Sequence, residues 1–321
     1  MIDKIRFSKK NLSECEIKKI VLTSRLQSYD ADGLKHYNNQ RTKNFNGGLF
    51  IKIGIENTLT IEGSLHKYAT YLKSKQLNNY DSFTMHQAKE TLLKLIENTG
   101  FKPENVMVNF YEVGLNIVTE IEPKELLKRI YSIGDFDKEK LFYINPKYKN
   151  ESEIITEFHK DFRLVYKMYD KVFEMQDRKK TFDFEKNIIR IETIHKRVEK
   201  TLLIDFFTDA NLKAVQKAFF NHWDKLNFLV EIVAPSKTNI AKIEFAKVLY
   251  KKSQSEVLKE ILEQYRNNTI SRKIYYNLKK FIENWETEKI MFKPTKSIIS
   301  SHWERMYNTE KQMYNKKINI N

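Results

Sequence analysis

A tyrosine between two lysines is the clearest candidate for chemistry in this chain. The stretch 162–171 alternates apolar and polar residues, which predicts a strand. On such a strand Arg163, Lys167, Tyr169 and Lys171 share one face, because side chains alternate between the two faces. A phenol is a nucleophile and lysines bind phosphate, so this face has parts suited to phosphodiester chemistry.

A second alternating stretch, 188–197, predicts a neighbouring strand on which Arg190 and Glu192 share a face. The carboxylate is a candidate metal ligand, and the guanidinium is a further cation for a phosphate. The alternative is a hairpin whose polar face is simply solvated.

Glu112 and His66 extend the set of candidate metal ligands. Glu112 lies inside the stretch 105–119, which is apolar on both faces and so predicts a central strand. A carboxylate there is costly unless it is paired or binds a metal, so a buried ion pair, for instance with Arg190, and a ligand role both stay open. His66 falls at the polar end of an expected strand, where it is either a surface residue or a ligand.

Composition favours a polyanionic partner. The 321 residues carry a formal net charge of +15, with 13% aromatic residues and a single cysteine, Cys15. One cysteine excludes an internal disulfide framework or a multi-cysteine zinc site, and fits a reducing cytoplasm. The N-terminal residues are not a signal peptide, and no run is long enough for a membrane span. Nucleic acid is therefore the expected partner, rather than a membrane or a small-molecule substrate.

The periodicity predicts an α+β fold in residues 1–205: one antiparallel sheet with packed helices. The expected strands are 49–55, 59–66, 106–118, 163–171 and 188–197, and the expected helices are 82–98 and 123–133.

Residues 206–321 are expected to form a basic, mainly helical region. They contain 21 Lys and Arg against 12 Asp and Glu. A turn at 267–271 leads into a helix with four candidate DNA-binding residues, and this composition suits a helix laid against duplex DNA. An ordinary solvated helix has the same composition. The four candidates are Arg272, Lys273, Lys279 and Lys280.

Three short motifs occur in order within residues 49–197: 59–68, 108–117, and 166–171 together with 189–192. As an ordered set they resemble the replication initiation proteins of the filamentous-phage gene II/gene X type, which also occur on plasmids and in prophages. The Tyr-Asp-Lys and Arg-x-Glu sequences are also similar to those of rolling-circle plasmid initiators. The resemblance implies a Rep-endonuclease-like fold and does not extend to the helical C-terminal region.

The resemblance further implies an enzyme that nicks and rejoins DNA at a replication origin. Such an enzyme attacks a phosphodiester with a tyrosine, stays joined to the 5′ phosphate and uses Mg²⁺ or Mn²⁺. Tyr169 is the favoured nucleophile, with Tyr166 and Tyr68 as rivals, and Lys167 or Lys171 would lower the pKa of the phenol.

His66, Glu112 and Glu192 are the metal ligands that the resemblance implies, although the usual His-hydrophobic-His triplet of tyrosine endonucleases is missing. Lys67, next to His66, is a further candidate for DNA binding. The expected partners are origin DNA and the host helicase and polymerase. Two alternatives remain: an origin-binding initiator without catalytic activity, and an RNA-binding regulatory protein.

Overall fold

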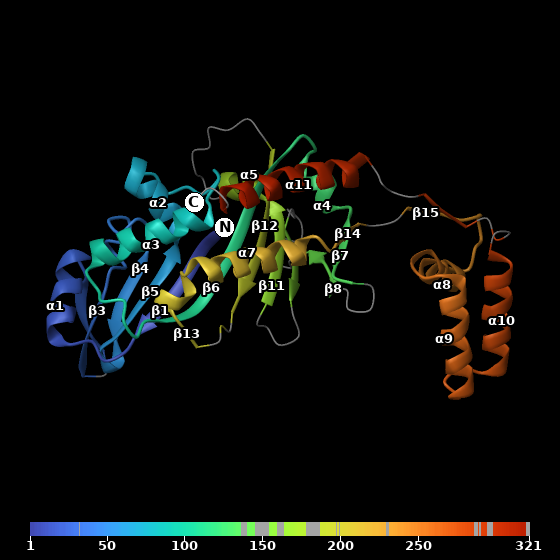
Figure 1. Cartoon of the computed structure of the whole chain (residues 1–321), viewed down its shortest axis with the longest axis horizontal. Coiled ribbons are helices and arrows are strands. Elements are labelled where there is room, and N and C mark those ends of the chain that lie inside the picture. The colour runs from blue at the N-terminus through green and yellow to red at the C-terminus, as the bar shows by residue number, and fades with distance from the viewer. Residues whose placement is uncertain are drawn as a thin grey trace. The chain divides into compact units, whose positions relative to one another are not determined.

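The chain folds into two compact units in this computed structural model (Figure 1). The first comprises 1–134, 140–227 and 302–321, and the second comprises 135–139 and 228–301. The structure describes residues 1–31, 33–135, 140–144, 154–158, 164–177, 187–196, 198, 200–228, 231–285, 288, 290–293 and 298–318. Arg163 therefore lies outside the described residues, as does most of the connector between the two strands that carry the Tyr and Arg-x-Glu motifs.

A mainly antiparallel sheet forms the first unit, in the order β2-β3-β4-β5-β1-β6-β12-β11-β10-β9, with β13 also paired to β6. This confirms the predicted fold class. The strands are β1 (Ile2–Lys9), β2 (Gln27–Ala31), β3 (Leu34–Asn38), β4 (Phe50–Gly54), β5 (Thr58–Ser64), β6 (Met107–Thr119), β9 (Tyr143–Ile144), β10 (Ile154–Phe158), β11 (Leu164–Asp170), β12 (Asn187–His195) and β13 (Thr201–Leu202). A smaller sheet has the order β14-β7-β8, formed by Leu226–Phe228, Ile130–Ile133 and Lys140–Leu141.

The centre of the main sheet is β6, flanked by β1 and β12. Its residues Val113, Leu115 and Ile117 are buried, as the apolar stretch predicted. The segment 2–9 is less apolar, yet it inserts between β5 and β6 and becomes a central strand. This position brings the start of the chain into the middle of the sheet.

Helices of the first unit pack on the sheet and on one another (Figure 1). They are α1 (Glu14–Thr23), α2 (Leu65–Ser74), α3 (Met85–Thr99), α4 (Pro123–Leu127), α5 (Lys171–Asp177), α6 (Leu203–Phe206), α7 (Asp209–Trp223) and α11 (Ile298–Ile318). Ser13 caps α1 and forms a capping box with Glu16, and α3 ends at Gly100 in the left-handed conformation.

Two predicted elements end earlier than the sequence indicated. The strand expected at 59–66 ends at Ser64, whose hydroxyl accepts a hydrogen bond from the Lys67 amide and so caps α2. The helix expected at 123–133 ends at Leu127, and residues 130–133 become a strand. His66 consequently lies in the first turn of a helix rather than at a strand end.

The second unit is helical, as predicted for the C-terminal region. Helices α8 (Ile240–Lys251), α9 (Gln254–Arg266) and α10 (Arg272–Glu283) enclose a small core, and β15 (Glu231–Val233) pairs with β16 (Met291–Lys293). Its buried residues are Ala246, Leu249, Val257, Ile261, Phe281, Ile282 and Ile290.

The division between the units differs from the predicted break at residue 205. Trp223 of α7 is buried, and its Nε1 donates a hydrogen bond to Thr193 Oγ1 of β12 at 3.1 Å. Tyr307 of α11 donates to the Phe220 carbonyl at 3.2 Å. Both helices therefore belong to the sheet unit, and the helical unit lies between them in sequence. Among the described residues, no helix is both long enough and apolar enough to cross a membrane.

Candidate active site

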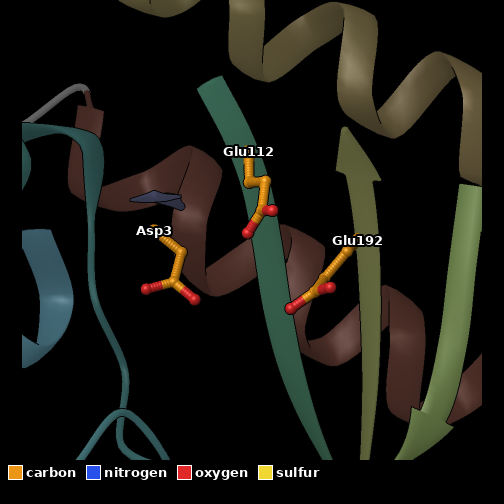
Figure 2. A group of neighbouring side chains, drawn as sticks. All are labelled: Asp3, Glu112 and Glu192. Atoms are coloured by element: carbon orange, nitrogen blue, oxygen red, sulfur yellow. The ribbon is translucent and has the colours of Figure 1, made fainter. Parts of the chain in front are cut away.

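Three carboxylates converge at the centre of the sheet: Asp3 of β1, Glu112 of β6 and Glu192 of β12 (Figure 2). One oxygen from each lies within 4.8 Å of the others. Asp3 and Glu192 are buried, and Glu112 is half-buried. The structure thus brings Glu112 and Glu192 together, as predicted, and adds a third acid that the sequence reading did not include.

Asp3 reaches this group because β1 is irregular. Ile2 pairs with Val113 of β6 and Ile5 pairs with Tyr111, so three steps along β1 match only two along β6. Such a β-bulge re-aims a side chain that strict alternation would send to the other face. Strict alternation along the sequence therefore could not indicate that Asp3 lies on the same face as Glu112.

Arg190 holds two of the three carboxylates. Its Nε donates to Glu192 Oε1 at 2.5 Å, its Nη2 donates to Asp3 Oδ2, and its Nη1 donates to Asn116 Oδ1 at 2.8 Å. The side chain is 1% exposed and lies over Gly114, where a Cβ would clash with the guanidinium. Arg190 was predicted as a cation for the phosphate; in the structure its guanidinium is engaged by these acids.

Glu112 is the least stabilised of the three acids. Arg190 pairs with Asp3 and Glu192, so the ion pair considered between Arg190 and Glu112 is not formed. Burial, and then the charges of Glu192 and Asp3, raise the pKa of Glu112 to about 8. Burial also acts to raise the pKa of Glu192, but Lys167 and Arg190 outweigh it and hold that pKa below its usual range. These surroundings therefore favour the protonated form of Glu112 and the ionised form of Glu192.

Tyr169 of β11 lies beside the triad, on the same side of the sheet. Its hydroxyl donates to Glu192 Oε1 at 3.0 Å, and the side chain is 3% exposed. Burial and the Glu192 charge raise its pKa well above the usual value. The expectation that Lys167 or Lys171 lowers this pKa is therefore wrong: desolvation of the phenolate and the Glu192 charge outweigh the opposing charge, which is that of Arg190.

The two predicted lysines lie close to Tyr169. Lys167 Nζ is 4.3 Å from the Tyr169 ring centroid and 3.6 Å from Glu192 Oε2. Lys171 is the first residue of α5 rather than part of the strand, and its Nζ lies 2.7 Å from Glu174 Oε2. Burial and the Arg190 charge lower the pKa of Lys171 to about 8.

A cavity of about 610 Å³ opens onto these groups. Its lining includes the three carboxylates, Tyr169 and five lysines, namely Lys4, Lys43, Lys67, Lys167 and Lys171. Lys67, predicted to bind DNA, thus lies at the same cavity as the candidate nucleophile.

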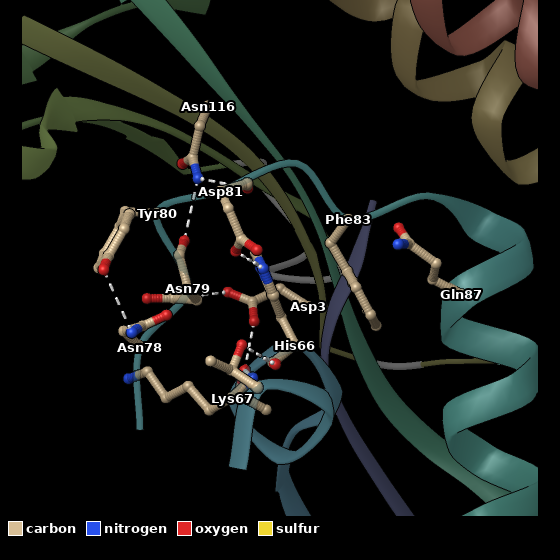
Figure 3. A network of polar contacts seen from close by, with 12 residues as sticks. Asp3, His66, Lys67, Asn78, Asn79, Tyr80, Asp81, Phe83, Gln87 and Asn116 are labelled. Atoms are coloured by element: carbon tan, nitrogen blue, oxygen red, sulfur yellow. Dashed lines mark hydrogen bonds and ion pairs between the residues drawn. The ribbon is translucent and has the colours of Figure 1, made fainter. Parts of the chain in front are cut away.

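His66 lies next to the triad but does not line the cavity. Its Nε2 is 2.5 Å from Asp81 Oδ1, and its ring stacks on Phe83 with centroids 4.6 Å apart (Figure 3). Asp3 instead contacts Ser64 Oγ and Asn79 Nδ2, the latter at 3.0 Å. The third candidate metal ligand beside Glu112 and Glu192 is therefore Asp3, and not His66 as predicted.

The rival tyrosines lie elsewhere. Tyr166 is buried with its ring edge-on to His222 and Trp223 of α7, on the side of β11 away from Tyr169. The Tyr68 hydroxyl accepts a hydrogen bond from Asn98 Nδ2 at 2.8 Å, between α2 and α3. Neither residue lines the cavity.

The other predicted DNA-binding residues are on α10 of the second unit. Arg272, Lys273 and Lys280 are exposed, and Lys279 Nζ lies 3.7 Å from Glu283 Oε1. The predicted contact of α10 with DNA stays a prediction. The chain matches no protein-family model, and no curated protein matches it significantly in sequence.

Proposed function

We propose that this chain is a rolling-circle replication initiator with a Rep-endonuclease-like fold, which nicks and rejoins origin DNA of a phage or plasmid through a covalent link to Tyr169. One observation carries the proposal: a buried tyrosine hydroxyl and three carboxylates share one lysine-lined cavity. Nucleophile, phosphate-binding cations and candidate metal ligands are the parts that phosphodiester transfer needs. Origin DNA is the substrate, with the host helicase and polymerase acting after the nick.

The carboxylates fit Mg²⁺ or Mn²⁺. All three offer oxygen, which hard divalent cations prefer, and none offers sulfur or nitrogen. The pKa of Glu112 is raised by burial and by its two acidic neighbours, so a cation among them would favour the ionised form. A bound cation would polarise the scissile phosphate.

Tyr169 supplies the attacking oxygen. In the reaction its Oη forms a bond to phosphorus, the bond from phosphorus to the 3′ oxygen breaks, and that oxygen leaves as a 3′-OH after taking up a proton from water. The resting site keeps the phenol protonated, because burial and Glu192 raise its pKa. The hydroxyl proton must leave for attack, and Glu192 is the group that this proton already contacts.

A covalent adduct tests the proposal. Labelled single-stranded fragments that tile the DNA around the coding sequence are incubated with the protein and Mn²⁺, and denaturing gels show any protein–DNA adduct. We expect an adduct with the wild type and with Tyr166→Phe, but none with Tyr169→Phe. An adduct with Tyr169→Phe would refute the assignment of the nucleophile. No adduct with the wild type would favour the initiator without catalytic activity or the RNA-binding protein.

A further inference from the structure

Two phenylalanines mark the ends of a row across four strands of the main sheet. Phe50 of β4 pairs with Glu62 of β5, Glu62 pairs with Arg6 of β1, and Arg6 pairs with Phe110 of β6. Directly paired residues point to the same side of a sheet, so the four side chains share one face. Three interstrand spacings of about 4.8 Å place the two rings roughly 14 Å apart.

Each ring has cations over it. Lys4 Nζ lies 5.3 Å and Arg6 Cζ 5.6 Å from the Phe110 ring centroid, and Lys43 Nζ lies 5.7 Å from that of Phe50. Both rings are half-buried rather than covered. A partly exposed aromatic face beside a cation is the combination on which an unpaired base stacks while its phosphate is neutralised.

The charge along the row is positive. Glu62 is the acidic residue of the row, and it forms ion pairs with two cations. Its Oε1 lies 2.9 Å from Lys4 Nζ and its Oε2 lies 3.7 Å from Arg6 Nη1. The side chains of Lys4 and Arg6 remain 37% and 42% exposed, so both can also reach a ligand. This surface therefore complements an anion.

The row leads into the carboxylate site. Phe110 precedes Glu112 by two residues on the same strand, so both side chains lie on one face. Phe50, Glu62, Lys4 and Lys43 also line the cavity that contains the triad. A strand lying on this row would therefore bring a neighbouring phosphate toward Tyr169.

We propose that Phe110 and Phe50, with Lys4, Arg6 and Lys43, form a stacking platform for single-stranded DNA. The identity of this strand as the substrate rests on the proposed function. One base stacks on each ring and the cations contact the intervening phosphates. The bases of a duplex are already stacked on each other, so the platform selects an unpaired strand.

Equilibrium binding without catalysis tests the platform. The probe is fluorescein-labelled dT12, measured by fluorescence anisotropy with full-length protein in EDTA. Stacking is worth about 1–3 kcal/mol per base, so Phe110→Ala and Phe50→Ala should each weaken binding about 5- to 150-fold. Phe110→Trp should bind within about twofold of the wild type, because it keeps an aromatic face. Tyr29→Ala removes a 43% exposed aromatic ring on edge strand β2 and should change nothing.

The outcomes separate this proposal from the nicking activity. Weaker dT12 binding by Phe110→Ala, together with no adduct from the wild type, would support the platform and refute the nuclease. Unchanged dT12 binding by folded Phe110→Ala would overturn the platform even where the adduct forms. Loss of binding in Phe110→Trp as well would show that the substitutions disturb packing rather than base stacking, and would overturn the proposed platform. Tighter binding to rU12 than to dT12 would overturn the choice of DNA.

Discussion

Replacing Glu112 with glutamine should stabilise the metal-free protein at neutral pH. Glu112 shares its surroundings with Glu192 and Asp3, whereas Arg190 serves the other two acids. Between pH 4.5 and 8 folding therefore costs free energy, because Glu112 is ionised in the unfolded chain and must take up a proton as the chain folds. Glutamine has nearly the shape of the protonated acid and never ionises, so Glu112→Gln removes this cost.

The magnitude follows from the pKa of Glu112, which folding raises from the usual 4.5 to about 8. A group whose folded pKa is raised keeps its proton better in the folded state, so stability falls as pH rises from 4.5 to 8. At about 1.4 kcal/mol per pH unit the loss is on the order of 3 kcal/mol at pH 7 and below about 1 kcal/mol at pH 5. The gain from Glu112→Gln should have the same pH dependence.

Urea unfolding in EDTA at pH 5 and pH 7 measures this difference. Tryptophan fluorescence is a suitable probe because Trp223 and Trp303 are both buried in the sheet unit. The variant should exceed the wild type in stability at pH 7 and nearly match it at pH 5. Adding Mn²⁺ should stabilise the wild type more than the variant. A variant less stable than the wild type at pH 7 in EDTA would refute the assignment of an electrostatic cost to Glu112.

Two further predictions follow from the packing and from the division into units. Gly114→Ala should destabilise the protein by about 3 kcal/mol in urea unfolding, because its Cβ would lie 2.9 Å from Arg190 Cζ and displace a buried guanidinium. Gly54→Ala is the control, because its Cβ would lie 3.6 Å from the nearest atom. Equal losses of stability in the two variants would contradict this reason. Replacing 229–297 with a Gly-Ser linker should weaken duplex binding and its salt dependence while leaving single-strand nicking intact, since α7 and α11 are kept. Unchanged duplex affinity would exclude a DNA-binding role for α10.

Periodicity was a sound guide wherever local pattern and tertiary environment agree. The strands around Glu112, Tyr169 and Glu192 were predicted from alternation, and their side chains do meet. The helix end at residue 127 and the start of α2 at 65 were missed, because a cap or a partner strand decided them. His66 was misplaced for this reason: one serine hydroxyl that caps α2 moved it from a strand face to a helix turn.

The strongest omission is Asp3, which completes the carboxylate site. Asp3 lies in a short segment that has little apolar content, and alternation would place its side chain with Ile5, on the core face. Only pairing with β6 creates the bulge that turns it toward Glu112. Such pairing joins residues more than 100 positions apart, so no local window contains it.

The position of Asp3 also explains why Arg190 is buried rather than exposed to substrate. With Glu192 alone, a buried guanidinium would keep unsatisfied donors, and burying it would be costly. Asp3 and Asn116 accept hydrogen bonds from Nη2 and Nη1, so each guanidinium nitrogen has a partner at 1% exposure. Arg190 pairs with the other two acids and not with Glu112, so nothing from Arg190 offsets the burial and the neighbouring acids that raise the pKa of Glu112. The bulge in β1 therefore determines both which residue neutralises the site and which acid is left for a divalent cation.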